Sequence, residues 1–296
     1  MCARFTGTSP PKVLWNAILA AFNQSEINNV VGDAYYMALF LRKSRTILTI
    51  HDCVSLERLR GWRKLVFCWL WYRLPVRRAK VVTVVSQSTK KELLRYVRCD
   101  AAKVQVIYNC ISDDFQPVPR EFNTTRPVIL QVGTFYNKNI ERTSEALRGI
   151  PCHLRIVGKP NRDQEMALRK NYIDYSTVSQ ISREEMVREY ANCDMLVFAS
   201  TYEGFGLPII EAQATARPVV TSKLLSMPEV SGDGACLVDP YDVASIREGV
   251  LRVVDDPTYR DQLIASGLEN ARRFRTQTIA EQYATLYRKV KAESGA

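Results

Sequence analysis

An apolar run, a glycine-rich turn and a helix follow one another near the middle of the chain, and this unit constrains the fold most strongly. Residues 195–199 (Met-Leu-Val-Phe-Ala) are typical of a strand buried on both faces of a parallel sheet. Gly204 and Gly206 permit a sharp turn with close backbone approach. Pro208 suits the first position of a helix, which we expect to continue to about Arg217. The unit therefore predicts a parallel sheet covered by helices.

The same alternation extends over the whole chain and predicts an α/β protein. In the first part, strands are expected at residues 29–31, 46–50, 81–85 and 104–107. In the second part, strands are expected at residues 128–132, 153–157, 195–199, 219–222 and 236–238. A helix is expected from Ser86 to about Val97, and three closing helices are expected near 242–254, 257–273 and 276–291. Strands that alternate with helices in this way form parallel sheets with helical crossovers.

The length of the chain allows two domains. With 296 residues, each domain would have about 150 residues, which is a usual size. The polar, proline-rich stretch at residues 113–127 is the expected linker. We therefore expect an N-terminal domain over residues 1–118 and a C-terminal domain over residues 126–296, with the last helix returning to the N-terminal domain.

Two carboxylates flank the glycine-rich turn. Glu203 precedes it, and Glu211 follows eight residues later, near the start of the expected helix. The N–H groups of Gly206 and Leu207 are expected to point out of the helix N-terminus, at the carboxyl end of a strand. This is where α/β sheets hold anionic ligands. Carboxylates beside such a site suggest recognition of the hydroxyls of a phosphorylated sugar.

The stretch from Glu203 to Glu211 resembles the E-x7-E signature of the GT-B glycosyltransferases called family 4. An ordered series of other segments, spread over residues 28 to 291, is also similar to that family. These segments are 49–52, 84–86, 106–109, 130–134 with 138–139, 155–159, 181–185, 218–220, 228–230 and 237–240. The resemblance implies two Rossmann-like domains whose parallel sheets face each other across a cleft. Because residues 1–45 show no glycine pair after a strand, we also expect the N-terminal domain to be short by a strand or two.

The resemblance also implies an activity and roles for particular residues. The activity is metal-independent transfer of a sugar from a nucleoside-diphosphate sugar to an acceptor hydroxyl, with retention of configuration and with no cofactor besides the donor. Glu203 would bind hydroxyls of the donor sugar, Glu211 the ribose, and Lys138 the diphosphate. His51 would lie near the transferred sugar. The other donor-binding positions are Gly133, Thr134, Gly204, Phe205, Gly206 and Leu207.

Each of these side chains also has a purely structural interpretation. Glu203 and Lys138 suit a solvated surface, Glu211 would complement the helix dipole, and a lone histidine such as His51 is usually structural. The family often supplies a second phosphate-binding cation, but Thr134 and Asn137 occupy its places here. Lys159 or Arg162, after the next strand, would be substitutes.

Several classes of protein are disfavoured by the absence of their motifs. The sequence contains no D-x-D, no G-x-x-x-x-G-K-[ST] and no G-x-G-x-x-G, which argues against the usual metal-dependent glycosyltransferase site, a P-loop ATPase and a dinucleotide dehydrogenase. Eight scattered cysteines without a C-x-x-C pair, and only two histidines, favour reduced thiols and no zinc site. Residues 1–6 show no apolar signal core, and no apolar run approaches about 20 residues. We expect a cytoplasmic protein.

The net charge of +10 lies entirely in the first part of the chain. Residues 1–125 hold 19 Lys and Arg against 9 Asp and Glu, whereas residues 126–296 hold 22 of each. Residues 59–75 add three of the four tryptophans among four basic residues. A basic, tryptophan-rich helix suggests an anionic membrane surface, and a helix packed on the sheet is the alternative. The expected partners are a nucleotide-sugar and a glycan or lipid-linked acceptor. Nucleic acid is a weaker candidate because no recognition-helix motif is present.

Two other functions remain open from the sequence. A sugar-nucleotide 2-epimerase shares the fold that the resemblance implies. A non-catalytic module that binds a nucleotide-sugar or a partner is favoured by the short N-terminal part. The base and sugar of the donor are not legible from these residues.

Overall fold

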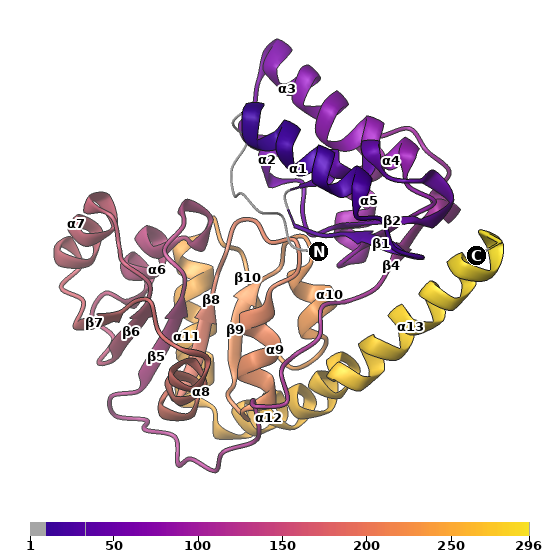
Figure 1. The fold of residues 1–296 in the computed structure, drawn as a ribbon. Coiled ribbons are helices and arrows are strands. Elements are labelled where there is room, and N and C mark those ends of the chain that lie inside the picture. The colour runs from indigo at the N-terminus through magenta and orange to yellow at the C-terminus, as the bar shows by residue number, and fades with distance from the viewer. Residues whose placement is uncertain (1–9, 33, 296) are drawn as a thin grey trace. The chain divides into compact units, whose positions relative to one another are not determined.

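The computed structural model describes residues 10–32 and 34–295 (Figure 1). The chain forms two compact units, the first from residues 1–108 and 279–296 and the second from residues 109–278. The stretch at residues 1–6, which we searched for a signal core, lies outside the described part. The predicted shortening of the N-terminal domain stays a prediction.

The first unit is built on a parallel sheet in the order β1-β2-β3-β4. Its strands are β1 (Asn28–Val30), β2 (Thr46–Ile50), β3 (Val81–Val84) and β4 (Val104–Val106), within one residue of the predicted bounds. Ile47 is in register with Val81 and Ile50 with Val84. All residues of β2 and β3 are buried, which explains why both strands consist of apolar residues and threonine, with no charged side chain.

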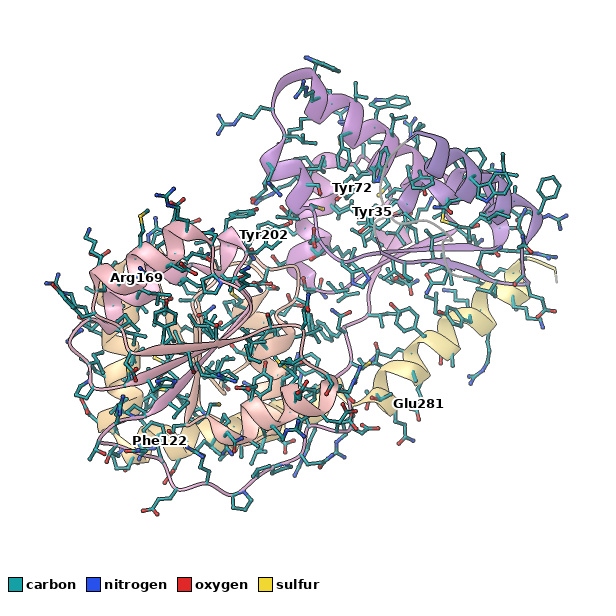
Figure 2. All side chains as sticks on the ribbon, turned by 60° about the vertical axis from the view of Figure 1, so that its left-hand side comes forward. Tyr35, Tyr72, Phe122, Arg169, Tyr202 and Glu281 are labelled. Atoms are coloured by element: carbon teal, nitrogen blue, oxygen red, sulfur yellow. The ribbon has the colours of Figure 1, made fainter. Side chains whose placement is uncertain are left out.

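Helices cover both faces of this sheet. They are α1 (Pro10–Phe22), α2 (Val54–Arg58), α3 (Gly61–Phe67), α4 (Leu74–Arg78), α5 (Gln87–Tyr96) and the last helix, α13 (Thr276–Glu293). Short 3-10 turns lie at η1 (Tyr35–Phe40), η2 (Lys43–Arg45) and η4 (Ala101–Lys103). Ile279, Leu286 and Val290 of α13 pack in one cluster with Ile47 and Val81. On the other face the rings of Tyr35 and Tyr72 meet edge to face with centroids 5.6 Å apart (Figure 2).

The second unit contains a six-stranded parallel sheet in the order β10-β9-β8-β5-β6-β7. Five strands match the predicted ones: β5 (Val128–Val132), β6 (His153–Val157), β8 (Met195–Phe198), β9 (Val219–Ser222) and β10 (Cys236–Val238). The sixth, β7 (Tyr175–Val178), was missed. It is the edge strand beside β6, and none of its residues is buried. An edge strand without a buried apolar run carries no clear sequence signal.

The helices of the second unit flank this sheet. They are α6 (Ile140–Leu147), α7 (Arg162–Lys170), α8 (Arg183–Asn192), α9 (Leu207–Ala214), α10 (Met227–Ser231), α11 (Val243–Asp255) and α12 (Pro257–Ala271), with 3-10 turns η5 (Tyr136–Lys138) and η6 (Arg272–Phe274). Helix α9 ends before the predicted Arg217. Ala216 adopts a left-handed conformation with φ of 60°, and the Arg217 N–H bonds back to the Ala212 carbonyl, which closes the helix.

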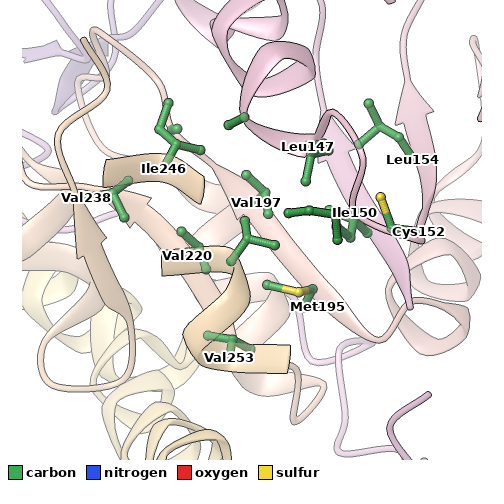
Figure 3. Close-up of a cluster of buried hydrophobic side chains, with 14 of the residues drawn as sticks. Leu147, Ile150, Cys152, Leu154, Met195, Val197, Val220, Val238, Ile246 and Val253 are labelled. Atoms are coloured by element: carbon green, nitrogen blue, oxygen red, sulfur yellow. The ribbon is translucent and has the colours of Figure 1, made fainter. Parts of the chain in front are cut away.

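The core of the second unit lies between the sheet and helices α6 and α11. Figure 3 shows Leu147 of α6 and Ile246 of α11 on either side of Val197 and Val220. Each of these four side chains is fully buried. Burial of one such side chain contributes about 1.5–3 kcal/mol, so this cluster fixes the positions of the strands that carry the candidate site.

The expected linker is held against the second unit. The fully buried carboxylate of Asp194 accepts a hydrogen bond from Arg120 Nε at 2.8 Å and another from the Val128 N–H at 2.7 Å. Together these bonds compensate the burial of the Asp194 charge. The stretch from Arg120 to Val128 therefore has a defined position at the amino ends of β5 and β8.

Candidate functional site

The candidate site is formed by the loops that follow β5 and β8, neighbouring strands of the second unit. Ser226 holds the loop after β8 in place. Its hydroxyl donates to the carbonyls of Glu203 and Phe205, each at 2.9 Å. Gly206, with φ of 109°, makes the turn into α9, a backbone angle that other residues rarely adopt. The Thr201 N–H donates to the Asn137 carbonyl at 2.9 Å, which ties the two loops together.

Lys138 and Glu203 meet between these two loops. Lys138 Nζ lies 2.6 Å from Glu203 Oε1, and the side chains are only 17% and 14% exposed. Asn137 Nδ2 donates to the same carboxylate oxygen at 3.2 Å and to the Tyr202 carbonyl at 2.7 Å. The ammonium also lies 4.5 Å from the centroid of the Phe198 ring. A cation and a carboxylate that the sequence placed 65 residues apart are therefore direct partners.

Gly133 allows Lys138 to occupy this position. Its φ is 86°, and a Cβ at residue 133 would lie 2.9 Å from Lys138 Cε. Thr134, the next residue of this loop, lies close to Gly158, which follows β6. A Cβ at Gly158 would lie 2.7 Å from Thr134 Cγ2. Gln164 Nε2 donates to the Thr134 carbonyl at 3.0 Å. These contacts hold the loop after β5 close to its strand.

Glu211 is held by a residue that the sequence analysis missed. The hydroxyl of Tyr190, on α8, donates to Glu211 Oε2 at 2.7 Å. Burial raises the pKa of Glu211, although the Tyr190 hydrogen bond acts in the opposite direction. Burial and the neighbouring Glu211 charge raise the pKa of Tyr190 well above its usual value. The Tyr190 ring is fully buried and packs edge to face on Phe115 with centroids 5.6 Å apart.

No sequence signal singled out Tyr190. It lies at the end of a helix 21 residues before Glu211 and belongs to no motif. Only the tertiary packing of α8 beside α9 brings the hydroxyl to the carboxylate. The structure therefore adds a tyrosine to the predicted pair of glutamates.

The back of α9 is fixed by an amide network. The fully buried Gln213 donates through Nε2 to the carbonyls of Ser231 at 2.8 Å and Gly234 at 3.1 Å. Asn270 Nδ2, on α12, donates to Gln213 Oε1 at 2.7 Å. Gly267 allows this approach, because a Cβ there would lie 3.0 Å from Gln213 Cγ. Helix α9 is thus hydrogen-bonded through Gln213 to the end of α10, to the loop that follows it and to α12.

The other predicted site residues differ in what they expose. The Phe205 ring is buried and packs edge to face on Phe274, with centroids 5.6 Å apart, and the Phe205 carbonyl accepts from the Ser226 hydroxyl. Leu207 is 39% exposed at the start of α9. Gly204 lies between them and Glu203 in the turn. Lys159 and Arg162, the suggested substitutes for a second cation, are both exposed.

His51 belongs to the first unit, at the carboxyl end of β2. Its backbone N–H donates to the Tyr35 hydroxyl at 3.4 Å. The adjacent Asp52 accepts a hydrogen bond from the Val54 N–H at 3.0 Å, which starts the turn into α2. Lys138, Glu203 and Glu211 belong to the second unit, so the predicted residues divide between the two units.

Three further properties bear on the predictions from composition. The seven cysteines within residues 10–32 and 34–295 are all free. Across the same residues, no group of three or more His, Cys, Asp or Glu side chains is placed to hold a metal ion. Among the described helices, none combines the length and the apolar character that a membrane span requires.

Solved structures define the class of this fold. The chain superposes on sucrose-phosphate synthase from Thermosynechococcus elongatus with a TM-score of 0.83 and 23% identity, over 95% of this chain and 78% of the other. It superposes on Anabaena HepE in complex with UDP-glucose with a TM-score of 0.79 and 17% identity, over 94% and 82% of the two chains. The fold is therefore that of the GT-B glycosyltransferases, as the resemblance implied.

The sequence profile of the family described as glycosyl transferases group 1 matches residues 112–270, and that described as glycosyltransferase family 4 matches residues 24–115. The chain belongs to the glycosyl transferases group 1 family. O-antigen chain mannosyltransferase B of Escherichia coli is 28% identical over 235 residues, which are 71% of this chain and 61% of that protein. The D-inositol 3-phosphate glycosyltransferase of a Nocardioides strain is 37% identical over 118 residues, 39% of this chain and 26% of that protein. The chain thus spans less than two thirds of either relative.

Proposed function

We propose that this chain transfers a sugar from a nucleoside-diphosphate sugar to an acceptor hydroxyl with retention of configuration. The observation that carries the proposal is the pair of Lys138 and Glu203 at the carboxyl ends of β5 and β8, beside the N-terminus of α9. A cation and a helix N-terminus suit a diphosphate, and a carboxylate suits sugar hydroxyls. The names of the relatives and the UDP-glucose held by HepE support this assignment.

The proposed roles follow from the positions of the side chains. The diphosphate is bound by Lys138 and by the N–H groups of Gly206 and Leu207. Glu203 accepts hydrogen bonds from hydroxyls of the donor sugar. Glu211, oriented by Tyr190, accepts hydrogen bonds from the ribose. For His51 we keep the predicted role of a hydrogen bond near the transferred sugar.

The chemical step exchanges one bond to the anomeric carbon for another. The bond from that carbon to the diphosphate oxygen breaks, and a bond to the acceptor oxygen forms on the same face of the sugar. The acceptor proton passes to an oxygen of the departing diphosphate. Lys138 stabilises the negative charge that builds on this leaving group. The step uses no metal ion and no cofactor besides the donor.

The acceptor and the location of the protein are part of the same proposal. We expect a glycan or a lipid-linked acceptor, in agreement with the O-antigen chain named for the first relative. The protein would act in the cytoplasm, attached peripherally to the inner face of the membrane.

A panel of nucleoside diphosphates and their sugars tests the proposal. A ligand at about 100 times its dissociation constant stabilises a protein by about 2.7 kcal/mol, which a thermal-shift assay detects readily. Each donor that binds is then incubated with glycan and lipid-linked acceptors, and the anomeric configuration of the product is read by NMR. Binding without transfer or donor hydrolysis would instead identify a non-catalytic module. An epimerised nucleotide-sugar would identify a 2-epimerase.

A further inference from the structure

One face of the helical segment between β2 and β3 is apolar and exposed. This segment runs through α3, the π-helical stretch η3 (Cys68–Arg73) and α4 without a break. Large apolar side chains recur along it every three to four residues, as on one side of a helix. They are Trp62 (70% exposed), Leu65 (64%), Val66 (48%), Trp69 (47%) and Leu70 (42%). We call these five residues the apolar face.

The opposite side of the same segment is anchored in the first unit. Cys68 and Tyr72 are buried, and the Phe67 and Trp71 rings stack with centroids 5.2 Å apart against the core. The Tyr72 hydroxyl donates to the Asp52 carbonyl at 3.2 Å. One side of the segment is therefore packed on the core of the first unit, as the alternative prediction of a packed helix requires. Because that side already buries its own side chains, the apolar face is left for another partner.

The segment that carries the apolar face is rich in basic residues, and Glu57 and Glu92 flank it, with Glu57 near Lys64. Residues 58–91 contain ten Lys and Arg and no Asp or Glu. Arg63 lies over the Trp62 ring at 5.7 Å, and Lys64 over the Tyr96 ring at 4.9 Å. The long aliphatic stems of such residues reach from an apolar region to charged groups at its border. The partner is therefore expected to be apolar at its centre and anionic at its edge.

A basic cavity adjoins the apolar face. It has a volume of about 330 Å³ and is lined by Trp69, Leu74 and Val97 together with the arginines Arg73, Arg77 and Arg98. Arg73 Nε donates to the Tyr96 carbonyl at 3.0 Å, which fixes its guanidinium at the wall. The ion pairs formed within the described part of the chain do not include these three arginines. Three guanidinium groups with no carboxylate in the lining suit a phosphate group.

We propose that this surface docks on an anionic lipid bilayer, with a lipid phosphate in the cavity of Arg73, Arg77 and Arg98. The apolar face enters the boundary between headgroups and acyl chains, where tryptophan is favoured. The basic side chains around it meet anionic headgroups. A nucleic acid would satisfy the charges but leave five large apolar side chains in water. This docking does not depend on the transfer reaction, and it would place the proposed enzyme at a lipid-linked acceptor.

Vesicle flotation tests the bilayer. We expect the full chain to float with vesicles that contain phosphatidylglycerol and not with vesicles of phosphatidylcholine alone. Binding should weaken as salt rises, because the Debye length falls below about 8 Å above physiological ionic strength. Tryptophan fluorescence should shift to shorter wavelength on binding. A folded protein that remains unbound with both vesicles at low salt overturns the proposal, as does binding of duplex DNA that is as tight as that of anionic vesicles.

Substitution of the apolar face tests the insertion. Trp62→Ser with Leu65→Ser removes two exposed side chains, so far-UV circular dichroism and melting temperature should stay unchanged. The partition coefficient for anionic vesicles should fall by at least tenfold. The matched control is Tyr172→Ser, which removes a side chain that is 87% exposed in the second unit, and it should bind as the parent protein does. Equal binding by the double variant and this control contradicts insertion.

Charge removal tests the cavity. One basic residue near an anionic leaflet strengthens binding about fivefold, so the variant with Arg73, Arg77 and Arg98 changed to Ala should lose about a hundredfold. Arg98→Ala alone changes only an exposed residue and serves if the triple variant is unstable. The first control removes Arg60, Arg63 and Lys64 from the same segment, outside the cavity. The second removes Arg148, Arg169 and Lys170 from the second unit. A phosphate site requires the cavity variant to lose more vesicle affinity than either control. Equal losses in the cavity variant and in the variant of Arg60, Arg63 and Lys64 rule the phosphate site out.

Discussion

Lys138 Nζ and Glu203 Oε1 lie 2.6 Å apart, although one residue follows β5 and the other follows β8. Each group satisfies the charge of the other in a largely buried place. A diphosphate that binds Lys138 must compete with this carboxylate, and a sugar hydroxyl that donates to Glu203 must share it with the ammonium. The diphosphate and the sugar hydroxyl are therefore expected to bind together. When the diphosphate draws Lys138 away from Glu203, the hydroxyl gives Glu203 a new hydrogen-bond donor.

Glu203→Gln should slow transfer by about tenfold to a hundredfold. The amide keeps the shape of the side chain but loses a charge-assisted hydrogen bond, which is worth about 1.5–3 kcal/mol. Initial rates with the true donor measure the effect. Glu269→Gln is the matched control, because it removes a carboxylate whose ion pair with Arg272 is exposed. Wild-type turnover in Glu203→Gln would remove this residue from the proposed site.

Lys138→Ala should weaken binding of the nucleoside diphosphate and leave binding of the nucleoside nearly unchanged. The ammonium meets the phosphates in the proposed complex and has no contact with the base. Isothermal calorimetry with both ligands separates the two effects. Lys223→Ala serves as the control, since its exposed ion pair with Asp239 lies in the same unit. Equal losses for diphosphate and nucleoside would contradict the assignment.

Gly133→Ala should reduce both stability and diphosphate affinity. Its positive φ makes a side chain strained by about 1–2 kcal/mol, and the new Cβ would also displace Lys138. Gly149→Ala is a close control: its φ is 74°, but nothing lies within 4 Å of an added Cβ. We expect both variants to lower the melting temperature and only Gly133→Ala to weaken diphosphate binding. A similar affinity in both variants would show that Lys138 does not depend on this glycine.

Tyr190→Phe should raise the donor Michaelis constant and leave turnover nearly unchanged. Contacts to the ribose are made equally in the ground and transition states, so they act as uniform binding. Glu211→Ala should have the same signature. Because both residues act through one hydrogen bond, Tyr190→Phe should add little in the Glu211→Ala background. Additive effects in this double-mutant cycle would separate the two residues.

Tyr190→Phe should also change the pH dependence of donor binding. The pKa of Glu211 is raised, so affinity that needs its ionised carboxylate is present above that pKa and is lost as pH falls through it. The Tyr190 hydrogen bond lowers this pKa, and its removal should therefore move the loss of affinity to higher pH. Donor titrations across the acidic range measure the shift. A shift to lower pH would reverse the proposed role of the hydroxyl.

Chelation tests the metal-free step. Treatment with EDTA should leave the transfer rate unchanged, because the proposed leaving group is stabilised by Lys138 and backbone N–H groups. The assay is run with the same donor and acceptor before and after dialysis. Loss of turnover that added Mg²⁺ or Mn²⁺ restores would assign the charge stabilisation to a metal ion.

The sequence supported the fold wherever a local pattern sufficed. The apolar run is continuous in the buried strand β8 and interrupted only by threonine in β2, and the bounds of both were predicted within a residue. The edge strand β7 has no such run, and the end of α9 depends on one left-handed residue, Ala216. The side chains of the candidate site were predicted one by one. Their partners were not, because the contacts of Glu203 with Lys138 and of Glu211 with Tyr190 arise only from tertiary packing.

The amide network behind α9 gives this helix a fixed rotation about its own axis. Residues 211 and 213 are two positions apart, about 200° around the helix, so Gln213 faces away from the side that carries Glu211. While Gln213 stays bonded to Ser231, Gly234 and Asn270, the helix cannot turn, and the direction of the Glu211 side chain is set from behind. A methyl group added at Gly267 would lie 3.0 Å from Gln213 Cγ and would push on that side chain. Because Gln213 and Glu211 belong to the same helix, this displacement would rotate α9 and change the direction of the Glu211 side chain.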